Sequence, residues 1–294
     1  MQHTTVLLQE SVDALALQPG NTAIDCTLGL GGHTVLLAEA VGEAGRVLGL
    51  DVDEGALEAA KERLARFPQV SLRRANFRDL TSVAKSEGFG AVDGILFDLG
   101  WNSTQLEAGR GFSFCSHEPL VMTLSSPVAE GALTAHEIVN TWSEEDIADI
   151  VQTLGEERFA RRIARAIVEA RATAPIAYAD ELADIVASAV PKRTHGRIHP
   201  ATKTFQALRM MVNDELSSLE RALPEALGLL RSGGKMAVIT FHSLEDGLVK
   251  RIFKKFAASS EARLVTKKPT VPSQTEVRSN PRSRSAKLRV IEKL

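Results

Sequence analysis

Short apolar runs alternate with amphipathic stretches along the first hundred residues. The spacing predicts strands over 22–26, 46–50, 70–72 and 92–97 and helices over 34–41, 54–67 and 79–87. Ile95, Leu96 and Phe97 are apolar at consecutive positions, which indicates a strand buried on both faces. This alternation predicts an α/β fold with a doubly wound parallel sheet.

Helical patterns replace the alternation after about residue 110. They cover 144–154, 156–171 and 180–190, and a long helix from 201 to 223 restarts at Pro224. A buried strand over 236–241 then resumes the first pattern, and Ser243-Leu244-Glu245-Asp246 is expected to cap the next helix. We therefore expect one α/β domain formed by 1–109 and 201–294, with an all-helical substrate-recognition domain inserted at 110–200. The stretch 266–286 is expected to be a basic loop.

The composition is that of an ordinary globular protein, with 44% hydrophobic and 24% charged residues among 294. The sequence has no apolar run long enough for a membrane span and no secretion signal at its start. Cys26 and Cys115 are its two cysteines. They form neither a metal-ligand cluster nor a disulfide framework, which favours a reducing cytoplasm and no bound metal.

Charge is distributed unevenly along the chain. Residues 250–294 contain thirteen Lys and Arg against three Asp and Glu, a net charge of +10. Because the whole chain has a net charge of −2, residues 1–249 have a net charge of −12. A basic end on an acidic body is typical either of a solvated tail or of a contact with a polyanion.

A glycine-rich loop, Gly29-Leu30-Gly31-Gly32-His33, lies between the first strand and its helix. Backbone can approach a ligand closely there. The sixth position from Gly29 is Thr34, which disfavours the pyrophosphate of a dinucleotide and suits a nucleoside without phosphates, such as S-adenosylmethionine. Asp51 ends the second strand, where an acid can accept both ribose hydroxyls. Its alternative role, capping the next helix, suits Asp53 better.

Further candidate residues end the other strands. Phe77 lies just past the third strand and is either a core residue or one face of an adenine slot, while Asp98 and His242 end the fourth and fifth strands. Because ligands bind beyond the carboxyl ends of parallel strands, these residues are expected to share one edge of the sheet with the glycine loop.

The segment Asp98-Leu99-Gly100-Trp101 has the pattern of methyltransferases that act on exocyclic amines. The lone pair of a cytosine amine is delocalised into the ring, so hydrogen-bond acceptors on its protons make the nitrogen a better nucleophile, and an aromatic side chain holds the base. Asp98 and Trp101 suit these roles, although either could contact the cofactor instead, and Trp101 could simply fill space between two domains.

The chain resembles the RsmH (MraW) family along almost its whole length. The matching segments are His3–Leu8, Asp25–His33, Asp98–Gly100, Gln105–Glu107, Arg110–Phe114, Gly155–Arg158, His199–Thr202, Phe205–Arg209, Phe241–Asp246 and Asn280–Ser283. The resemblance implies a class I S-adenosylmethionine-dependent methyltransferase fold, Rossmann-like, that methylates N4 of a P-site cytidine in 16S rRNA of the small ribosomal subunit.

The resemblance implies that the cofactor is bound by Gly31, Gly32, His33, Asp51, Phe77, Asp98 and Gln105, and the glycine loop adds Gly29 to this set. From the residues at the strand ends we expect the catalytic set to be Asp98, Trp101, Asn102, Ser103 and His242. Basic side chains of the inserted domain and of the residues just after it become candidate RNA contacts: Arg158, Arg162, Arg165, Arg193, Arg197, His199 and Lys203. Otherwise the arginine face is a solvated helix surface with i,i+4 ion pairs. The sequence does not determine the oligomeric state, and a homodimer is one of the states it allows.

The chain departs from the family pattern near the expected target base. Trp101, Asn102 and Thr104 replace other residue types, and Leu120-Val121-Met122-Thr123-Leu124 stands where the family has Leu-Asp-Met-Arg-Met. We hypothesise that Trp101 and Asn102 compensate by stacking and hydrogen bonding. Two other functions remain as alternatives: a ribosome-binding or assembly protein that retains the fold without turnover, and an NAD-dependent dehydrogenase, which Thr34 disfavours.

Overall fold

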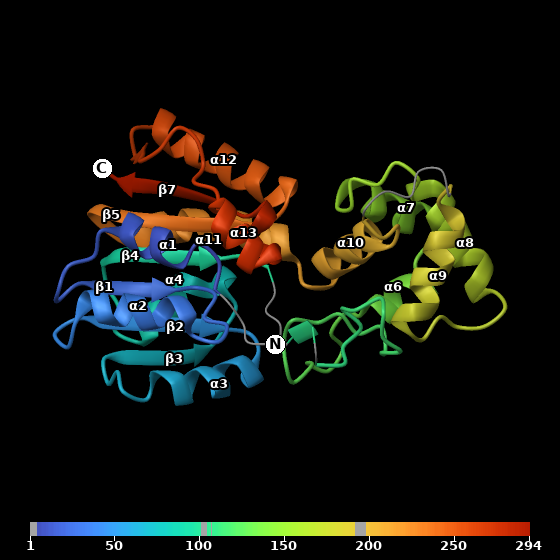
Figure 1. The fold of residues 1–294 in the computed structure, drawn as a ribbon, viewed down its shortest axis with the longest axis horizontal. Coiled ribbons are helices and arrows are strands. Elements are labelled where there is room, and N and C mark those ends of the chain that lie inside the picture. The colour runs from blue at the N-terminus through green and yellow to red at the C-terminus, as the bar shows by residue number, and fades with distance from the viewer. Residues whose placement is uncertain (1–4, 101–104, 107, 192–197) are drawn as a thin grey trace. The chain divides into compact units, whose positions relative to one another are not determined.

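The computed structural model describes residues 5–100, 105–106, 108–191 and 198–294. The chain divides into two compact units (Figure 1). The sheet unit comprises Met1–Asn102 and Leu216–Leu294, and the helical unit comprises Ser103–Glu215. Among the described residues, none of the helices combines the length and apolar character that crossing a bilayer requires.

The sheet unit contains a seven-stranded sheet in the order β3-β2-β1-β4-β5-β7-β6. Its strands are β1 (Thr22–Asp25), β2 (Arg46–Asp51), β3 (Val70–Arg74), β4 (Val92–Asp98), β5 (Leu230–Thr240), β6 (Ala262–Leu264) and β7 (Lys287–Lys293). The first five strands in this order are parallel, and β7 pairs antiparallel with both β5 and β6. The predicted α/β class and its parallel sheet are confirmed, with an antiparallel addition at one edge.

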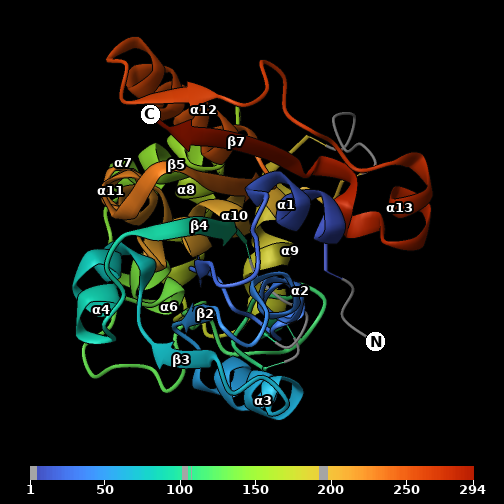
Figure 2. The ribbon, with the colours of Figure 1, turned by 90° about the vertical axis from the view of Figure 1, so that its left-hand side faces the viewer.

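Helices cover both faces of this sheet, as Figure 2 shows for α1, α2 and α3 on one side and α4 and α11 on the other. The helices of this unit include α1 (Leu8–Leu15), α2 (Gly32–Val41), α3 (Glu54–Leu64), α4 (Leu80–Ser86), α11 (Glu215–Leu229) and α12 (Ser243–Ala258). Along β4, Ile95 and Phe97 pack into the core on one face and Leu96 into the core on the other. The strand is buried on both faces, as predicted.

The helical unit has its own apolar core, formed by α6, α7, α8, α9 and α10. Their bounds are α6 (Ala135–Thr141), α7 (Glu144–Thr153), α8 (Ala160–Arg171), α9 (Ala179–Ala189) and α10 (Thr202–Val212). The predicted capping box is present, with Ser143 Oγ accepting the N–H of Asp146. Buried Arg110 donates to the carbonyl oxygens of Thr123, Leu124 and Ser125. The Arg110 guanidinium therefore holds Thr123 and Leu124, the last two residues of the segment that departs from the family pattern.

The helical unit spans Ser103–Glu215, whereas the inserted domain was predicted over 110–200. The predicted helix over 201–223 is two helices, since Asp214 adopts a left-handed conformation with φ of 49° between α10 and α11. Asn213 stabilises this break by accepting the N–H of Leu124 and donating to the carbonyl of Met122. Helix α10 therefore belongs to the helical unit. The predicted restart at Pro224 was wrong, because α11 continues through it.

The basic stretch 266–286, predicted as a loop, contains helix α13 (Gln274–Ser279) and a 3-10 turn over Pro281–Ser285. Ser273 caps α13 by accepting the N–H of Glu276. The Glu276 carboxylate in turn accepts the N–H of Leu7 at the start of α1. This segment therefore joins the chain's C-terminal part to its first helix.

Candidate active site

The glycine loop is held against the end of β2 by backbone and carboxylate hydrogen bonds. The N–H of Leu28 donates to the carbonyl of Leu50, and the N–H of Gly29 donates to Asp51 Oδ2 at 2.8 Å. Gly29 and Gly31 have φ of 51° and 75°, which glycine adopts without the cost other residues incur. A Cβ on Gly32 would collide with the Thr5 side chain. The loop is therefore preformed by its own contacts.

Asp51 is partly exposed and already accepts two hydrogen bonds, from the N–H groups of Gly29 and Asp53 at 2.8 and 2.9 Å. Each bond uses a different carboxylate oxygen, so each oxygen retains capacity for a further donor. Desolvation by burial raises the pKa of Asp51 to about 6. Asp53 caps α3 through Gly55, as predicted, which leaves Asp51 available for a ligand.

Asp98 ends β4 as a partly exposed residue whose Oδ1 atom is buried. Within the described part of the chain, its Oδ1 has no hydrogen-bond partner, and its Oδ2 lies 3.6 Å from His33 Nδ1. Burial raises the pKa of Asp98 well above its usual value, and repulsion from Asp25 and Glu245 raises it further. A buried acceptor that lacks a donor is costly unless a ligand supplies one.

Asp25 and Thr27 hold the end of β4 in place, a role that the sequence analysis did not assign. Thr27 Oγ1 accepts the N–H of Asp98 at 2.6 Å. Asp25 is fully buried and accepts from Thr34 Oγ1 at 2.6 Å and from the N–H of Thr27 at 3.1 Å. Desolvation raises the pKa of Asp25 to about 6. Asp25, which is buried, and Asp98, which is partly exposed, are two acids at the ends of adjacent strands, a proximity that depends on the pairing of β1 with β4.

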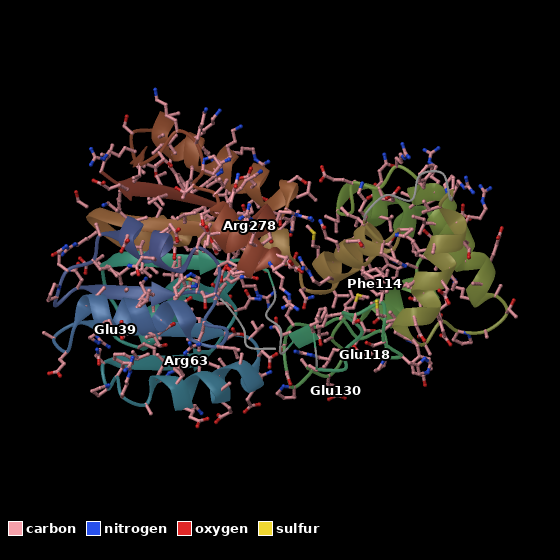
Figure 3. All side chains as sticks on the ribbon, in the orientation of Figure 1. Glu39, Arg63, Phe114, Glu118, Glu130 and Arg278 are labelled. Carbon is pink, nitrogen blue, oxygen red and sulfur yellow. The ribbon has the colours of Figure 1, made fainter. Side chains whose placement is uncertain are left out.

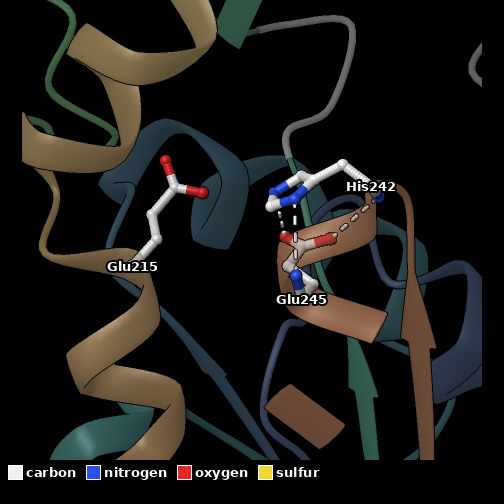
Figure 4. Close-up of side chains that lie close together, drawn as sticks. All are labelled: Glu215, His242 and Glu245. Carbon is white, nitrogen blue, oxygen red and sulfur yellow. Dashed lines mark hydrogen bonds and ion pairs between the residues drawn. The ribbon is translucent and has the colours of Figure 1, made fainter. Parts of the chain in front are cut away.

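His242 is the N-cap of α12, one residue earlier than the predicted cap. Figure 4 shows its imidazole beside the carboxylate of Glu245, with Nε2 3.1 Å from Oε1. Glu245 accepts the N–H of Phe241 through Oε2 at 2.8 Å, and His242 Nδ1 accepts the N–H of Glu245 at 3.4 Å. These contacts form a capping box, so His242 has a demonstrable structural role at the end of β5.

Phe77 packs at the edge of the core, the first of the two roles considered for it. Its ring makes an edge-to-face contact with Phe97 at 5.7 Å between centroids, and it packs at the margin of the core while remaining partly exposed. One side of the ring is thus fixed by the core, just beyond the end of β3.

The sheet unit therefore brings together most of the predicted cofactor residues at the carboxyl ends of the parallel strands. These are Gly29, Gly31, Gly32, His33, Asp51, Phe77 and Asp98, with His242 at the end of β5. Gln105 is buried and belongs to the helical unit. Three predicted catalytic residues, Trp101, Asn102 and Ser103, lie outside the described residues.

The predicted RNA contacts belong to the helical unit. Arg165 lies 3.5 Å from Glu144, whereas no described residue forms an ion pair with Arg158 or Arg162. Lys203 donates to the carbonyl of Glu156 at 2.7 Å. His199 stacks on Phe114, the ring labelled in Figure 3, at 4.6 Å between centroids. Arg193 and Arg197 fall outside the described residues.

A family model described as the MraW methylase family matches residues 1–294. The chain belongs to this family. A relative from Paenibacillus named "Ribosomal RNA small subunit methyltransferase H" is 47% identical over 100% of this chain and 99% of its own. A relative of the same name from Deinococcus deserti is 49% identical over 99% of this chain and 93% of its own.

A solved structure of an rRNA methylase from Streptococcus thermophilus aligns with 99% of this chain and 98% of its own, with a TM-score of 0.48 and 13% identity. Because the matched family is a family of methylases, this chain is a methyltransferase. The predicted family is therefore confirmed, and neither the dehydrogenase nor the non-catalytic assembly protein is favoured.

Proposed function

We propose that this methylase transfers a methyl group from S-adenosylmethionine to the exocyclic N4 of a cytidine in 16S rRNA of the small ribosomal subunit. The relatives' shared name supports the RNA class. The observation that carries the reaction is Asp98 Oδ1, a buried acceptor at the end of β4 without a hydrogen-bond partner among the described residues. Such a substrate would place the protein in the cytoplasm.

The residues at the strand ends fit the cofactor. Asp51 retains acceptor capacity for two ribose hydroxyls, and the N–H of Gly29 holds the glycine loop beside this carboxylate. Phe77 offers a ring already supported by Phe97. We assign Gln105 to the same role through the family resemblance. When bound, S-adenosylmethionine supplies an electrophilic methyl group on a positively charged sulfur.

Asp98 is proposed to accept a hydrogen bond from the target amine. Accepting a hydrogen bond from the amine concentrates the lone pair on N4 and prepares it to attack. The amine would also supply the hydrogen-bond partner that Asp98 Oδ1 lacks among the described residues. We propose Trp101, Asn102 and Ser103 as the groups that hold the base, and His242 as a positioning residue that fixes the start of α12.

Cofactor affinity is expected to fall at acidic pH. The ribose hydroxyls donate to the ionised form of Asp51, whose pKa burial raises to about 6. Affinity is therefore retained above this pKa and lost as the pH falls through it, by about tenfold between pH 7 and pH 5 for one titrating group. Isothermal titration with S-adenosylmethionine across this range measures the effect. In Asp51→Asn, a drop as steep as that of the wild type would contradict the assignment.

RNA affinity is proposed to come largely from the helical unit. The exposed arginines of α8 and the preceding turn, Arg158, Arg162 and Arg165, face solvent, and their contacts would be with phosphates, which position RNA without reading its sequence. Arg193, Arg197, His199 and Lys203 are proposed to extend this surface. A homodimer is also part of the proposal, and sedimentation of the purified protein would test it.

The proposed reaction is tested by transfer of tritiated methyl groups to small ribosomal subunits from a strain that lacks this enzyme. Incorporation at N4 of one cytidine, mapped at nucleotide resolution, is the expected result. Subunits that already carry the mark serve as the control and should accept no label. Absence of incorporation with intact cofactor and subunit binding would instead favour the assembly protein.

A further inference from the structure

A small basic cavity lies in the sheet unit between α12 and the strands β6 and β7. Its volume is about 30 Å³, room for one small anionic group, and its walls are Lys250, Phe253, Lys254, Leu264, Thr266, Lys267, Arg289 and Val290. Phe253 and Val290 are buried parts of the core, whereas the three lysines are exposed. A cavity with an apolar floor and a cationic rim is suited to an anion.

The charges at this cavity are unequally compensated. Arg289 donates to Asp246 at 2.7 Å, and Lys287 donates to the same carboxylate at 3.0 Å. In contrast, none of the side chains of Lys250, Lys254 and Lys267 forms a hydrogen bond or an ion pair with any residue that the structure describes. The rim therefore carries three positive charges without acidic partners there.

The lysines of α12 repel one another within the helix. Lys250 and Lys254 are four residues apart, as are Arg251 and Lys255, and like charges at this spacing destabilise a helix. Without a bound anion, these charge pairs do not stabilise helix α12. An anion bound between Lys250 and Lys254 would turn the repulsion into two favourable contacts.

The cavity lies on the helix that begins at the candidate active site. Helix α12 starts immediately after His242. With a rise of about 1.5 Å per residue, Lys250 and Lys254 lie about 12 and 18 Å along the helix from His242. An extended RNA strand covers this distance within a few nucleotides.

We propose that Lys250, Lys254 and Lys267 form a binding site for backbone phosphates of the RNA that flanks the target nucleotide. The proposal rests on the proposed function, because it takes RNA as the substrate. The chemistry is that of a phosphodiester: one negative group per nucleotide, recognised by point charges without base readout. This site belongs to the sheet unit, so it is separate from the arginines of α8.

The test compares two double variants that each remove two helical lysine charges. The variant K250Q/K254Q changes the cavity, whereas the control K61Q/K85Q changes α3 and α4, which lie toward the other edge of the sheet in Figure 2. Binding to a single-stranded RNA oligonucleotide is measured against salt concentration. For K250Q/K254Q we expect affinity to fall about tenfold at 0.1 M salt and the salt slope to fall by about 1.4.

The control should stay within about twofold of the wild type, and both variants should bind S-adenosylmethionine as the wild type does. Equal losses in both variants, or no loss in either, would overturn the proposal. So would a loss seen with ribosomal subunits but not with protein-free RNA, since the lysines would then bind a ribosomal protein. A wild-type protein that binds RNA as expected but transfers no methyl group would contradict the proposed function alone.

Discussion

Replacing Asp98 with alanine is expected to lower the rate of methyl transfer by about 10²- to 10⁴-fold, the range found when a group that stabilises the transition state is removed. The carboxylate lies at the end of β4, and its buried Oδ1 has no hydrogen-bond partner among the described residues. Without it, the amine lone pair remains delocalised. Single-turnover transfer of a tritiated methyl group to unmethylated small subunits measures this rate.

Asp93 provides a matched control on the same strand. Its carboxylate accepts the N–H of Thr22 at 2.7 Å, far from the carboxyl end of β4. Asp93→Asn should reduce stability while retaining most of the activity. Asp98→Asn, which keeps one acceptor oxygen but not the charge, should fall between the wild type and Asp98→Ala. Asp98→Ala with wild-type turnover would exclude Asp98 from the chemistry.

Replacing Asp51 with alanine is expected to weaken S-adenosylmethionine binding by about 10²-fold or more. Hydrogen bonds to a charged group contribute about 1.5–3 kcal/mol each, and the proposal assigns two of them to the ribose. The loss also removes the acceptors of Gly29 and Asp53, so the glycine loop itself loosens. Isothermal titration gives the affinity, and circular dichroism tests whether the variant is folded.

Asp53→Asn is the appropriate control for this experiment. Asp53 is two residues away and caps α3 through Gly55, and asparagine caps helices about as well as aspartate. Cofactor affinity should therefore be unchanged in Asp53→Asn. If the two variants lose affinity equally, the effect would come from disturbing the start of α3, and Asp51 would not be a ribose ligand.

Elements with a local signal in the amino-acid sequence lie where they are predicted. Buried strands appear as apolar runs because both faces of a parallel sheet are covered, and β1 to β4 therefore lie close to their predicted bounds. The strand at Lys287–Lys293 was not predicted, because only its first four residues alternate between charged and apolar. Its position between β5 and β6 depends on partners distant in the sequence.

Helix boundaries show the same limit. The apolar spacing of α10 continues into α11, so the sequence predicts one helix, whereas the break at Asp214 depends on Asn213 bonding to Met122 and Leu124. Those partners lie about ninety residues away along the chain. A domain boundary set by such contacts cannot be located from local spacing.

The residue types at the strand ends can be identified from the amino-acid sequence, and they indicate the class of chemistry: a glycine loop, an acid for a ribose and an acid before an aromatic residue. How these groups are held depends on the fold. Pairing of β1 with β4 brings Asp25 close to Asp98, and the end of β5 makes His242 a helix cap. Burial and charge proximity raise the carboxylate pKa values, and both depend on pairing between distant segments.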